Sequence, residues 1–251
     1  MSANLSSEEL ERYARHLPIP EIGAEGQRRL KEAAVLIVGA GGLGSAAALY
    51  LAAAGVGRLG LVDGDAVSLS NLQRQILHGS AVLGQPKVES ARRRLLDLNP
   101  LVRVEAYAEP FVAANAAALA APYQIVVDGS DNLPTRFLIN EVCVAAGKPF
   151  VYGAVFQFEG RASVFDARRG PCYGCLHPVL PPPGAVPDPA VGGVASPLPG
   201  TIGTIQAVET LKLLLGIGTP LVGRLLVYNA LDLSFETVAL RKNPDCKVCG
   251  S

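Results

Sequence analysis

The chain lacks net charge, because its 251 residues contain 22 Lys and Arg against 22 Asp and Glu. Such a balance produces no field that would attract a nucleic acid or a membrane surface, so neither is expected as a partner. The sequence has no charge-free apolar run of about 18 residues, the length of a membrane span. It also has no basic start followed by an apolar core and a cleavage site, so we expect no signal peptide. These absences predict a cytoplasmic protein.

Hydrophobic residues, by contrast, are abundant. They make up 49% of the chain, which is enough for a full core. We find no internal repeat and no linker, so residues 1–251 are expected to form a single domain. Within it, residues 1–31 read as an N-terminal helical arm, and residues 171–199 as a proline-rich, irregular crossover loop.

A strand, a glycine-rich turn and a helix follow one another between residues 33 and 54. Val35–Val38 is a short β-branched run typical of a buried strand, and Ser45–Ala54 is rich in Ala and Leu, as helices are. Between them, the pattern G-x-G-x-x-G is made by Gly39, Gly41 and Gly44. Glycines let the backbone approach a ligand closely, and a helix N-terminus attracts anions, so this unit predicts a phosphate site.

A carboxylate follows the next predicted strand, Leu59–Val62. Asp63 lies at about the spacing where such units bind a ribose hydroxyl. A tight turn without any ligand is the alternative, but the strand, the helix and the acidic residue together favour nucleotide binding. The motif alone does not tell which nucleotide is bound.

Polar residues gather where further strands end. The segment 65–75 is too polar for a core strand, and Asn71, Gln73 and Arg74 can donate hydrogen bonds to phosphate or sugar. Lys87 stands at the start of a helix predicted to run to Leu98. A cation at that end opposes the helix dipole, and this conflict is easier to accept if Lys87 binds an anion. Asp131 and Asn132 follow a strand at 124–127, and simple capping of the next helix is the alternative there.

The order of elements predicts an α/β fold. Strands at 102–107 and 124–127 alternate with helices at 112–120 and 135–146, which favours a doubly wound, mainly parallel, Rossmann-like sheet. Further strands are expected at 150–156 and 161–165. After a helix over 201–215 come late strands at 225–229 and 234–239, which we expect to be antiparallel.

Four of the five cysteines form two C-x-x-C pairs, Cys172 with Cys175 and Cys246 with Cys249. Four thiolates match a tetrahedral zinc site, and because protein atoms would fill every position, the zinc would be structural rather than catalytic. Redox chemistry or chance are the alternatives for each pair alone. Cys143 lies in an apolar helix and is expected to be a core residue.

These motifs together give the chain a family resemblance. It resembles the MoeB and ThiF proteins, ubiquitin-activating-type adenylyltransferases of molybdenum-cofactor and thiamine biosynthesis, and it is closer to the MoeB type. The resemblance rests on RYARH at 12–16, GAGGLG at 39–44, LVDGD at 61–65, SLSNLQRQ at 68–75, GQPK at 84–87, DGSDN at 128–132 and both C-x-x-C pairs.

The resemblance implies a reaction and a set of site residues. Such proteins bind ATP and Mg²⁺ and adenylate the C-terminal Gly-Gly carboxylate of a small ubiquitin-like sulfur-carrier protein, the MoaD or ThiS type. They work as homodimers, and Arg15 would reach the ATP of the second subunit. Asp131 would hold Mg²⁺, and Arg74 and Lys87 would act with these two in catalysis. The implied nucleotide-binding residues are Gly39, Gly41, Gly42, Gly44, Asp63, Ser70, Asn71, Leu72, Gln73, Arg74, Lys87, Asp131 and Asn132.

One departure concerns a cysteine that many relatives use for a persulfide or thioester step. Pro189 stands near its expected place, so we expect no covalent sulfur step in this chain and a separate sulfur donor protein. We also expect no sulfurtransferase-like extension after Cys249. The carrier and the pathway stay open. Two rival functions also remain: an NAD-dependent oxidoreductase, which would use the same glycine turn and Asp63, and a non-catalytic scaffold for a ubiquitin-fold partner.

Overall fold

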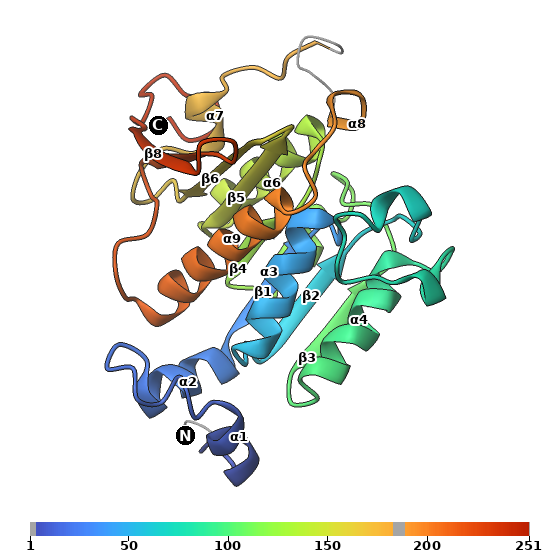
Figure 1. Ribbon diagram of the computed structural model, residues 1–251. Coiled ribbons are helices and arrows are strands. Elements are labelled where there is room, and N and C mark those ends of the chain that lie inside the picture. Colours follow the sequence, from blue (N-terminus) through green and yellow to red (C-terminus); the bar gives the residue numbers. More distant parts are fainter. Residues whose placement is uncertain (1–3, 183–188, 251) are drawn as a thin grey trace.

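A computed structural model describes residues 4–182 and 189–250. Within these residues, eight strands form one sheet in the order β3-β2-β1-β4-β5-β6-β7-β8 (Figure 1). The strands are β1 (Ala34–Val38), β2 (Arg58–Val62), β3 (Arg103–Tyr107), β4 (Ile125–Asp128), β5 (Phe150–Phe156), β6 (Glu159–Phe165), β7 (Arg224–Asn229) and β8 (Ser234–Ala239). Neighbours from β3 to β5 are parallel, and β5 to β8 are antiparallel. The predicted fold class is confirmed.

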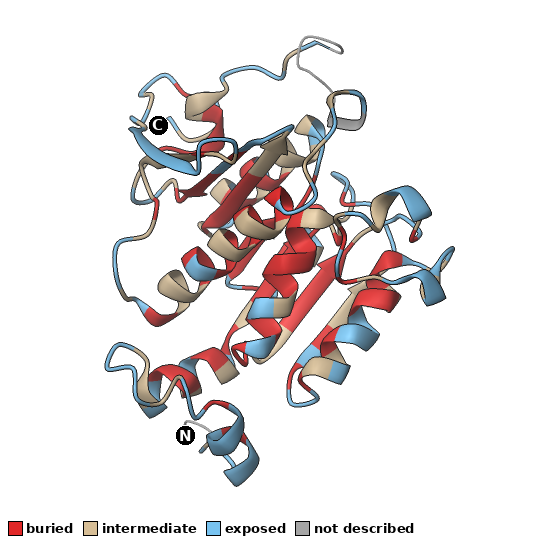
Figure 2. Cartoon of the chain, in the orientation of Figure 1, coloured by how far each residue is buried: buried red, intermediate tan, exposed pale blue. Residues whose placement is uncertain are grey.

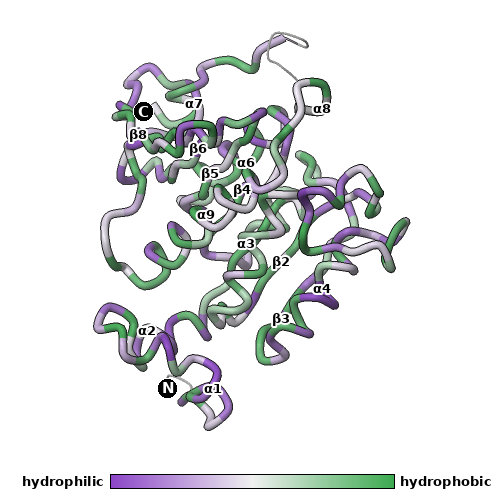
Figure 3. Tube along the Cα trace, in the orientation of Figure 1, coloured by the Kyte–Doolittle hydropathy of each residue, from purple (hydrophilic) through white to green (hydrophobic). Residues whose placement is uncertain are grey.

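Helices cover both faces of the sheet. They are α1 (Ser7–Arg12), α2 (Gly23–Glu32), α3 (Gly42–Ala53), α4 (Lys87–Leu98), α5 (Ala116–Ala120), α6 (Leu133–Ala145), α7 (Tyr173–Leu176), α8 (Pro189–Gly192) and α9 (Leu198–Leu215), with short 3₁₀ turns at Leu69–Asn71 and Ser80–Val82. One core cluster joins α3, α4 and α9 to one sheet face, and a second joins α5 and α6 to the other. Figures 2 and 3 show α3 as both buried and apolar, unlike α1. No helix in the described part of the chain is long and apolar enough to cross a membrane.

The described part of the N-terminal arm contains α1 and α2, with turns between them at residues 13–22. Ser6 and Glu9 form the reciprocal capping box at the start of α1. The arm packs where α3 and α4 end, because Asn99 donates hydrogen bonds to the Tyr13 hydroxyl at 3.0 Å and to the Ala52 carbonyl at 2.7 Å. The arm therefore lies at the amino edge of the parallel strands, as Figure 1 shows.

Several helix boundaries differ from the prediction, with α6 starting at Leu133 instead of Thr135 and α9 at Leu198 instead of Thr201. Helix α3 starts at Gly42 instead of Ser45, so the last glycines of the motif belong to its first turn. The helix expected at 112–120 covers only Ala116–Ala120, because the Asn115 side chain accepts a hydrogen bond from the Val112 amide and closes a turn there. Of the segment predicted to be irregular, 171–199, residues 183–188 lie outside the described residues, while the rest contains α7 and α8.

Candidate functional site

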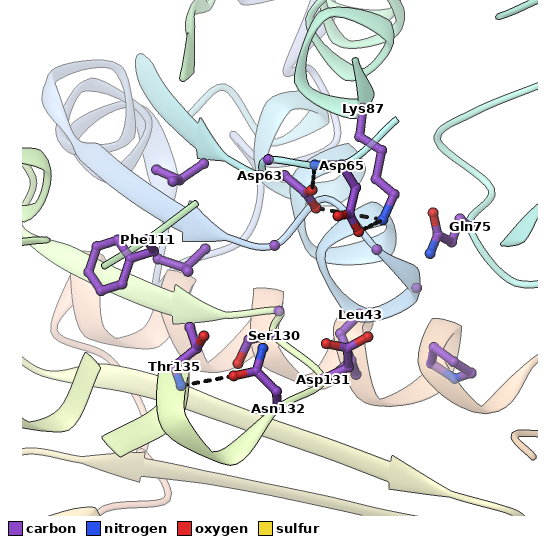
Figure 4. Close-up of a pocket in the computed structure, with 18 of the residues that line it drawn as sticks. Leu43, Asp63, Asp65, Gln75, Lys87, Phe111, Ser130, Asp131, Asn132 and Thr135 are labelled. Atoms are coloured by element: carbon purple, nitrogen blue, oxygen red, sulfur yellow. Dashed lines mark hydrogen bonds and ion pairs between the residues drawn. The ribbon is translucent and has the colours of Figure 1, made fainter. Parts of the chain in front are cut away.

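A cleft of about 620 Å³ opens at the carboxyl ends of β1, β2 and β4. In open α/β sheets, ligands bind at this edge. Figure 4 shows Asp63, Asp65 and Lys87 on one side of the cleft, with Ser130, Asp131 and Asn132 on the other. Phe111 adds an apolar surface to the wall. The cleft thus offers a glycine turn, charged groups of both signs and an apolar patch.

The glycine turn is packed too closely for side chains. Gly39 adopts a φ of +96°, which L-residues with side chains rarely reach. A Cβ on Gly44 would lie 1.9 Å from the carbonyl oxygen of Gly39, so Gly44 serves close packing of the turn rather than lining the cleft. A Cβ on Gly42 would lie 2.8 Å from Pro199 at the start of α9. Glycine is therefore required here, and the amide groups at the start of α3 stay open to the cleft.

Asp63 fixes this turn from the neighbouring strand. Its Oδ2 accepts a hydrogen bond from the Ala40 amide at 2.8 Å, and its Oδ1 accepts one from the Asp65 amide at 2.8 Å. An ionised carboxylate has about four acceptor positions, so capacity for a ribose hydroxyl remains. Asp63 is thus both a structural brace for the turn and a ligand candidate.

Lys87 is a buried cation at the first position of α4, with only 5% of its surface exposed. Its Nζ lies 2.7 Å from Asp65 and 4.0 Å from Asp63. Burial of a charge is costly unless it is paired, and the helix dipole is unfavourable at this end. The two carboxylates offset these costs and keep the ammonium group in the cleft.

On the opposite side, the loop after β4 is held by a buried ion pair. Asp128 is fully buried, and its Oδ1 accepts hydrogen bonds from the Ser130 amide at 3.0 Å and hydroxyl at 2.6 Å. The Nε of Arg136 lies 3.3 Å from the other oxygen of Asp128, and its guanidinium donates to the Ser130 carbonyl at 2.9 Å. Burial raises the pKa of Asp128, and Arg136 opposes that rise. The pair sets where the next residue, Asp131, enters the cleft.

Asn132 caps α6, since its side chain accepts a hydrogen bond from the Thr135 amide at 2.9 Å. The capping role considered from the sequence is therefore confirmed for Asn132. Asp131 makes no such cap; it is exposed and lines the cleft.

The structure brings most of the predicted site residues together. Those that line the cleft are Gly39, Gly41, Gly42, Asp63, Arg74, Lys87, Asp131 and Asn132. Ser70, Asn71, Leu72 and Gln73 lie on the adjoining loop but do not line it. The amide of Asn71 donates to Ser68, and its oxygen accepts a hydrogen bond from Gln75 at 2.9 Å.

Arg15 lies far from the cleft of its own chain. It is exposed in the turn after α1, where Tyr13 meets the ends of α3 and α4. The glycine turn lies at the opposite end of α3, whose 12 residues span about 18 Å. Arg15 therefore cannot serve this cleft without crossing the length of α3.

Several lining residues were not predicted from the sequence, namely Asp65, Gln75, Phe111, Ser130 and Arg136. Asp65 could have been found, because the LVDGD motif places it two residues after Asp63. Arg136 had a weaker signal: it follows the cap residue Asn132 by four positions and so lies on the same helix face. Phe111 had none, because a loop beyond β3 brings it to the cleft.

The four paired cysteines also converge. Their sulfur atoms all lie within 4.8 Å of one another. The Cys172–Cys246, Cys172–Cys175 and Cys175–Cys249 sulfur distances are 3.6, 3.9 and 3.4 Å. A tetrahedron with zinc–sulfur bonds of about 2.3 Å would separate its sulfurs by about 3.8 Å, so the cluster fits zinc.

Asn140 of α6 contacts the segment that carries the first cysteine pair. Its Nδ2 lies 3.7 Å from the Cys172 sulfur, and its Oδ1 accepts a hydrogen bond from the Tyr173 amide at 2.9 Å. Gly250 donates to the Cys246 carbonyl at 2.7 Å in the second pair. Such contacts around a metal site orient its ligands.

The ThiF family model matches residues 13–248. The chain belongs to the ThiF family. It is 52% identical to the sulfur carrier protein adenylyltransferase of Thermus thermophilus, with 98% of this chain and 92% of that protein covered. It is 51% identical to the SAMP-activating enzyme E1 of Haloferax volcanii, covering 100% and 92%. The resemblance predicted from the motifs is confirmed.

Other relatives are longer, and solved structures share the fold. The probable adenylyltransferase/sulfurtransferase MoeZ of Mycobacterium tuberculosis is 50% identical over 96% of this ThiF-family chain, which spans 62% of MoeZ. Crystal structures of E. coli MccB with MccA-N7isoASN and of MccB with ATP have TM-scores of 0.82 and 0.80, each at 24% identity. They cover 99% and 98% of this chain, and 76% and 75% of their own.

Proposed function

We propose that this protein uses ATP to adenylate the C-terminal carboxylate of a small ubiquitin-like sulfur-carrier protein ending in Gly-Gly. The observation that carries the proposal is the cleft, where the glycine turn, Asp63, Lys87 and Asp131 face one another. Full-length relatives about half identical to this chain are a sulfur carrier protein adenylyltransferase and an E1-type activating enzyme.

The proposed reaction needs no base from the protein. A terminal carboxylate is already ionised at neutral pH. One of its oxygens attacks the α-phosphorus of ATP, the bond to the bridging oxygen breaks, and pyrophosphate leaves with that electron pair. The products are an acyl-adenylate and pyrophosphate. The protein's task is then positioning and charge stabilisation.

The residue roles follow from their places in the cleft. The amides at the start of α3 would bind phosphate oxygens, and Asp63 would bind the ribose. Lys87, freed from Asp65 when phosphates enter, and Arg74 would neutralise phosphate charge. The loop of Ser70 to Gln73 would complete the phosphate wall in the loaded state, because it adjoins Arg74.

Asp131 offers a carboxylate oxygen, the kind of ligand that Mg²⁺ prefers, and Asn132 would lie beside the nucleotide. Asp131 is exposed to the cleft, which suits a metal that retains water ligands and also binds phosphate. When bound, Mg²⁺ would supply positive charge to the phosphates of ATP. Asp131 would hold it there.

A homodimer explains the place of Arg15. This side chain lies at the amino edge of its own sheet, beyond the far end of α3, so it would act on the cleft of a partner chain. Its guanidinium would stabilise charge on the transferred group, as arginines do in other phosphoryl transfers.

The four-cysteine cluster would hold a structural Zn²⁺. Its sulfur spacing supports this role, and all four ligands come from the protein, so no position is left for substrate. Sulfur would be delivered to the adenylate by a separate donor protein, since the sequence has no cysteine near Pro189.

ATP–pyrophosphate exchange tests the proposal directly. Exchange should need both ATP and a Gly-Gly-ending carrier, and a carrier lacking its last glycine should give none. A scaffold would bind carrier without exchange. An oxidoreductase would bind NAD rather than ATP at equilibrium. That alternative function also leaves Lys87 and Arg74 without a role. Absence of exchange with every ubiquitin-fold carrier encoded in the same genome would refute adenylation.

A further inference from the structure

His78 ends the sequence SNLQRQILH and takes no part in the roles assigned above, yet it contacts two elements, the glycine turn and α4, that supply residues to the cleft. Its Nε2 lies 2.9 Å from the carbonyl oxygen of Ala40, in the middle of the glycine turn. Its Nδ1 lies 2.9 Å from the hydroxyl of Ser90. Ser90 is in the first turns of α4, three residues after Lys87.

These contacts determine the state of the imidazole. A carbonyl oxygen can only accept, so Nε2 must carry the proton and donate it to Ala40. In the neutral ring Nδ1 is then an acceptor, and the Ser90 hydroxyl donates to it. Burial lowers the pKa of His78, and the charge of Lys87 lowers it further, whereas the bond to Ala40 and the charge of Asp63 oppose this. The neutral ring is thus the form that fits the site near neutral pH.

The two peptide groups that flank Ala40 are consequently both held. The Ala40 amide donates to Asp63 at 2.8 Å, and the Ala40 carbonyl accepts from His78. That carbonyl shares a peptide plane with the amide of Gly41, so the bond from His78 fixes the direction of this amide in the glycine turn. The same imidazole joins that turn to the helix whose first residue is Lys87. One side chain therefore links the two elements that would bind the phosphates.

We propose that His78 is a positioning residue for the nucleotide, which keeps the glycine turn and Lys87 in the arrangement that binds phosphate. The inference deepens the proposed function and rests on it. A merely structural role would instead lower the stability of the fold without a specific effect on ATP.

Three variants separate the two hydrogen bonds. His78→Leu loses both, His78→Gln can still donate to Ala40, and His78→Asn can still accept from Ser90 but is too short for Ala40. Binding of ATP with Mg²⁺ is measured calorimetrically for each. A disordered glycine turn should weaken binding about tenfold, which corresponds to about 1.4 kcal/mol of binding free energy. We expect that loss for His78→Leu and His78→Asn, and recovery of most of the affinity in His78→Gln.

Asn99 provides the matched control. It is fully buried and joins the ends of α3 and α4, as His78 joins their beginnings, but it lies away from the cleft. Asn99→Ala should lower the melting temperature and leave ATP affinity unchanged. If His78→Leu behaves in the same way, with a lower melting temperature and normal ATP affinity, the positioning role is refuted.

A double-mutant cycle with Lys87 tests whether His78 affects ATP binding through Lys87. If His78 acts by placing Lys87, His78→Leu should weaken ATP binding less in a Lys87→Ala background than in the wild type. If the losses of ATP-binding free energy in the two single variants add fully in the double variant, His78 does not act through Lys87. Should His78→Leu fail to fold, Ser90→Ala, a smaller change, replaces it in the cycle.

The imidazole nitrogen shifts of His78 in ¹⁵N NMR give a readout that needs no activity. A protonated Nε2 and an unprotonated Nδ1 at pH 7 are expected, and the opposite tautomer would contradict the geometry. Wild-type protein that binds no ATP would refute the proposed function itself. Wild-type protein that binds ATP, alongside His78 variants that bind it equally well, would refute only the inference about His78.

Discussion

Asp131 is the residue whose loss should affect the chemistry most directly. It is an exposed carboxylate lining the cleft next to the braced Ser130, and it would hold Mg²⁺ on the phosphates of ATP. Asp131→Asn should reduce ATP–pyrophosphate exchange by about 10²- to 10³-fold, since phosphate charge would go uncompensated.

The fold should survive this change, because the Asp131 side chain makes no helix cap. Circular dichroism and the melting temperature check that point. Asp97→Asn, another exposed carboxylate, in α4 and outside the cleft, is the control and should keep full exchange. Near-normal exchange by Asp131→Asn would end its assignment as the metal ligand.

Some site residues could be predicted from the sequence and others could not. Gly39 and Asp63 were found because a buried apolar strand precedes each, and parallel strands bring their carboxyl ends to one edge. Arg136 was missed because its partner, Asp128, belongs to another element, and an arginine in a helix usually faces solvent. The place of Phe111 depends on a loop path that no local pattern encodes.

At the scale of elements, the edge strand β3 pairs with β2 through its backbone, and one carboxylate adds side-chain contacts to that pairing. Glu105 lies 2.7 Å from Arg58 of β2 and accepts hydrogen bonds from the hydroxyls of Tyr123 and Tyr107 at 2.7 and 2.9 Å. Partial burial would raise the pKa of Glu105, but the bonds from Arg58 and the tyrosines outweigh it and lower the pKa to about 2. The charged form is therefore favoured in the folded state.

A pH dependence of stability follows. Because the folded pKa of Glu105 is below its unfolded value of about 4.3, its stabilisation is present above pH 4.3 and is lost as pH falls towards 2. Glu105→Gln should lower the free energy of unfolding by about 2 kcal/mol at pH 7. This difference between wild type and variant should become smaller below pH 4, and urea titrations at several pH values measure it. A difference that is constant with pH would contradict this assignment.

The two C-x-x-C pairs tie the C-terminal tail to α6 and α7, so metal and tail stability should change together. Purified protein should contain one zinc per chain, and Cys246→Ala should lose it, since structural zinc contributes folding energy. A lower melting temperature and faster proteolysis after residue 240 are expected. Cys143→Ala, at the cysteine outside the cluster, should keep the metal. Zinc-free wild-type protein with four reactive thiols would disprove the site.

At the scale of the whole molecule, the sheet separates two parts of one proposed active site. The cleft lies at the carboxyl edge of the parallel strands. Arg15 follows α1, the helix that lies beyond the amino edge of these strands (Figure 1). Within one chain the length of α3, about 18 Å, stands between them. The sequence motifs predicted both the cleft residues and Arg15. They could not show the distance between the two, because that distance depends on how the N-terminal arm packs against Asn99.

Mixing two inactive variants decides whether Arg15 acts across a dimer. Arg15→Ala chains and Asp131→Asn chains should each be inactive alone. In a mixed dimer, one cleft would combine Asp131 of its own chain with Arg15 of the other, so hybrids should recover about half of wild-type exchange if the sites act independently. Arg15→Ala should also lower turnover more than ATP affinity, because the guanidinium would act on transition-state charge. If subunits exchange but the mixture stays inactive, or if a monomer is fully active, Arg15 does not act in trans.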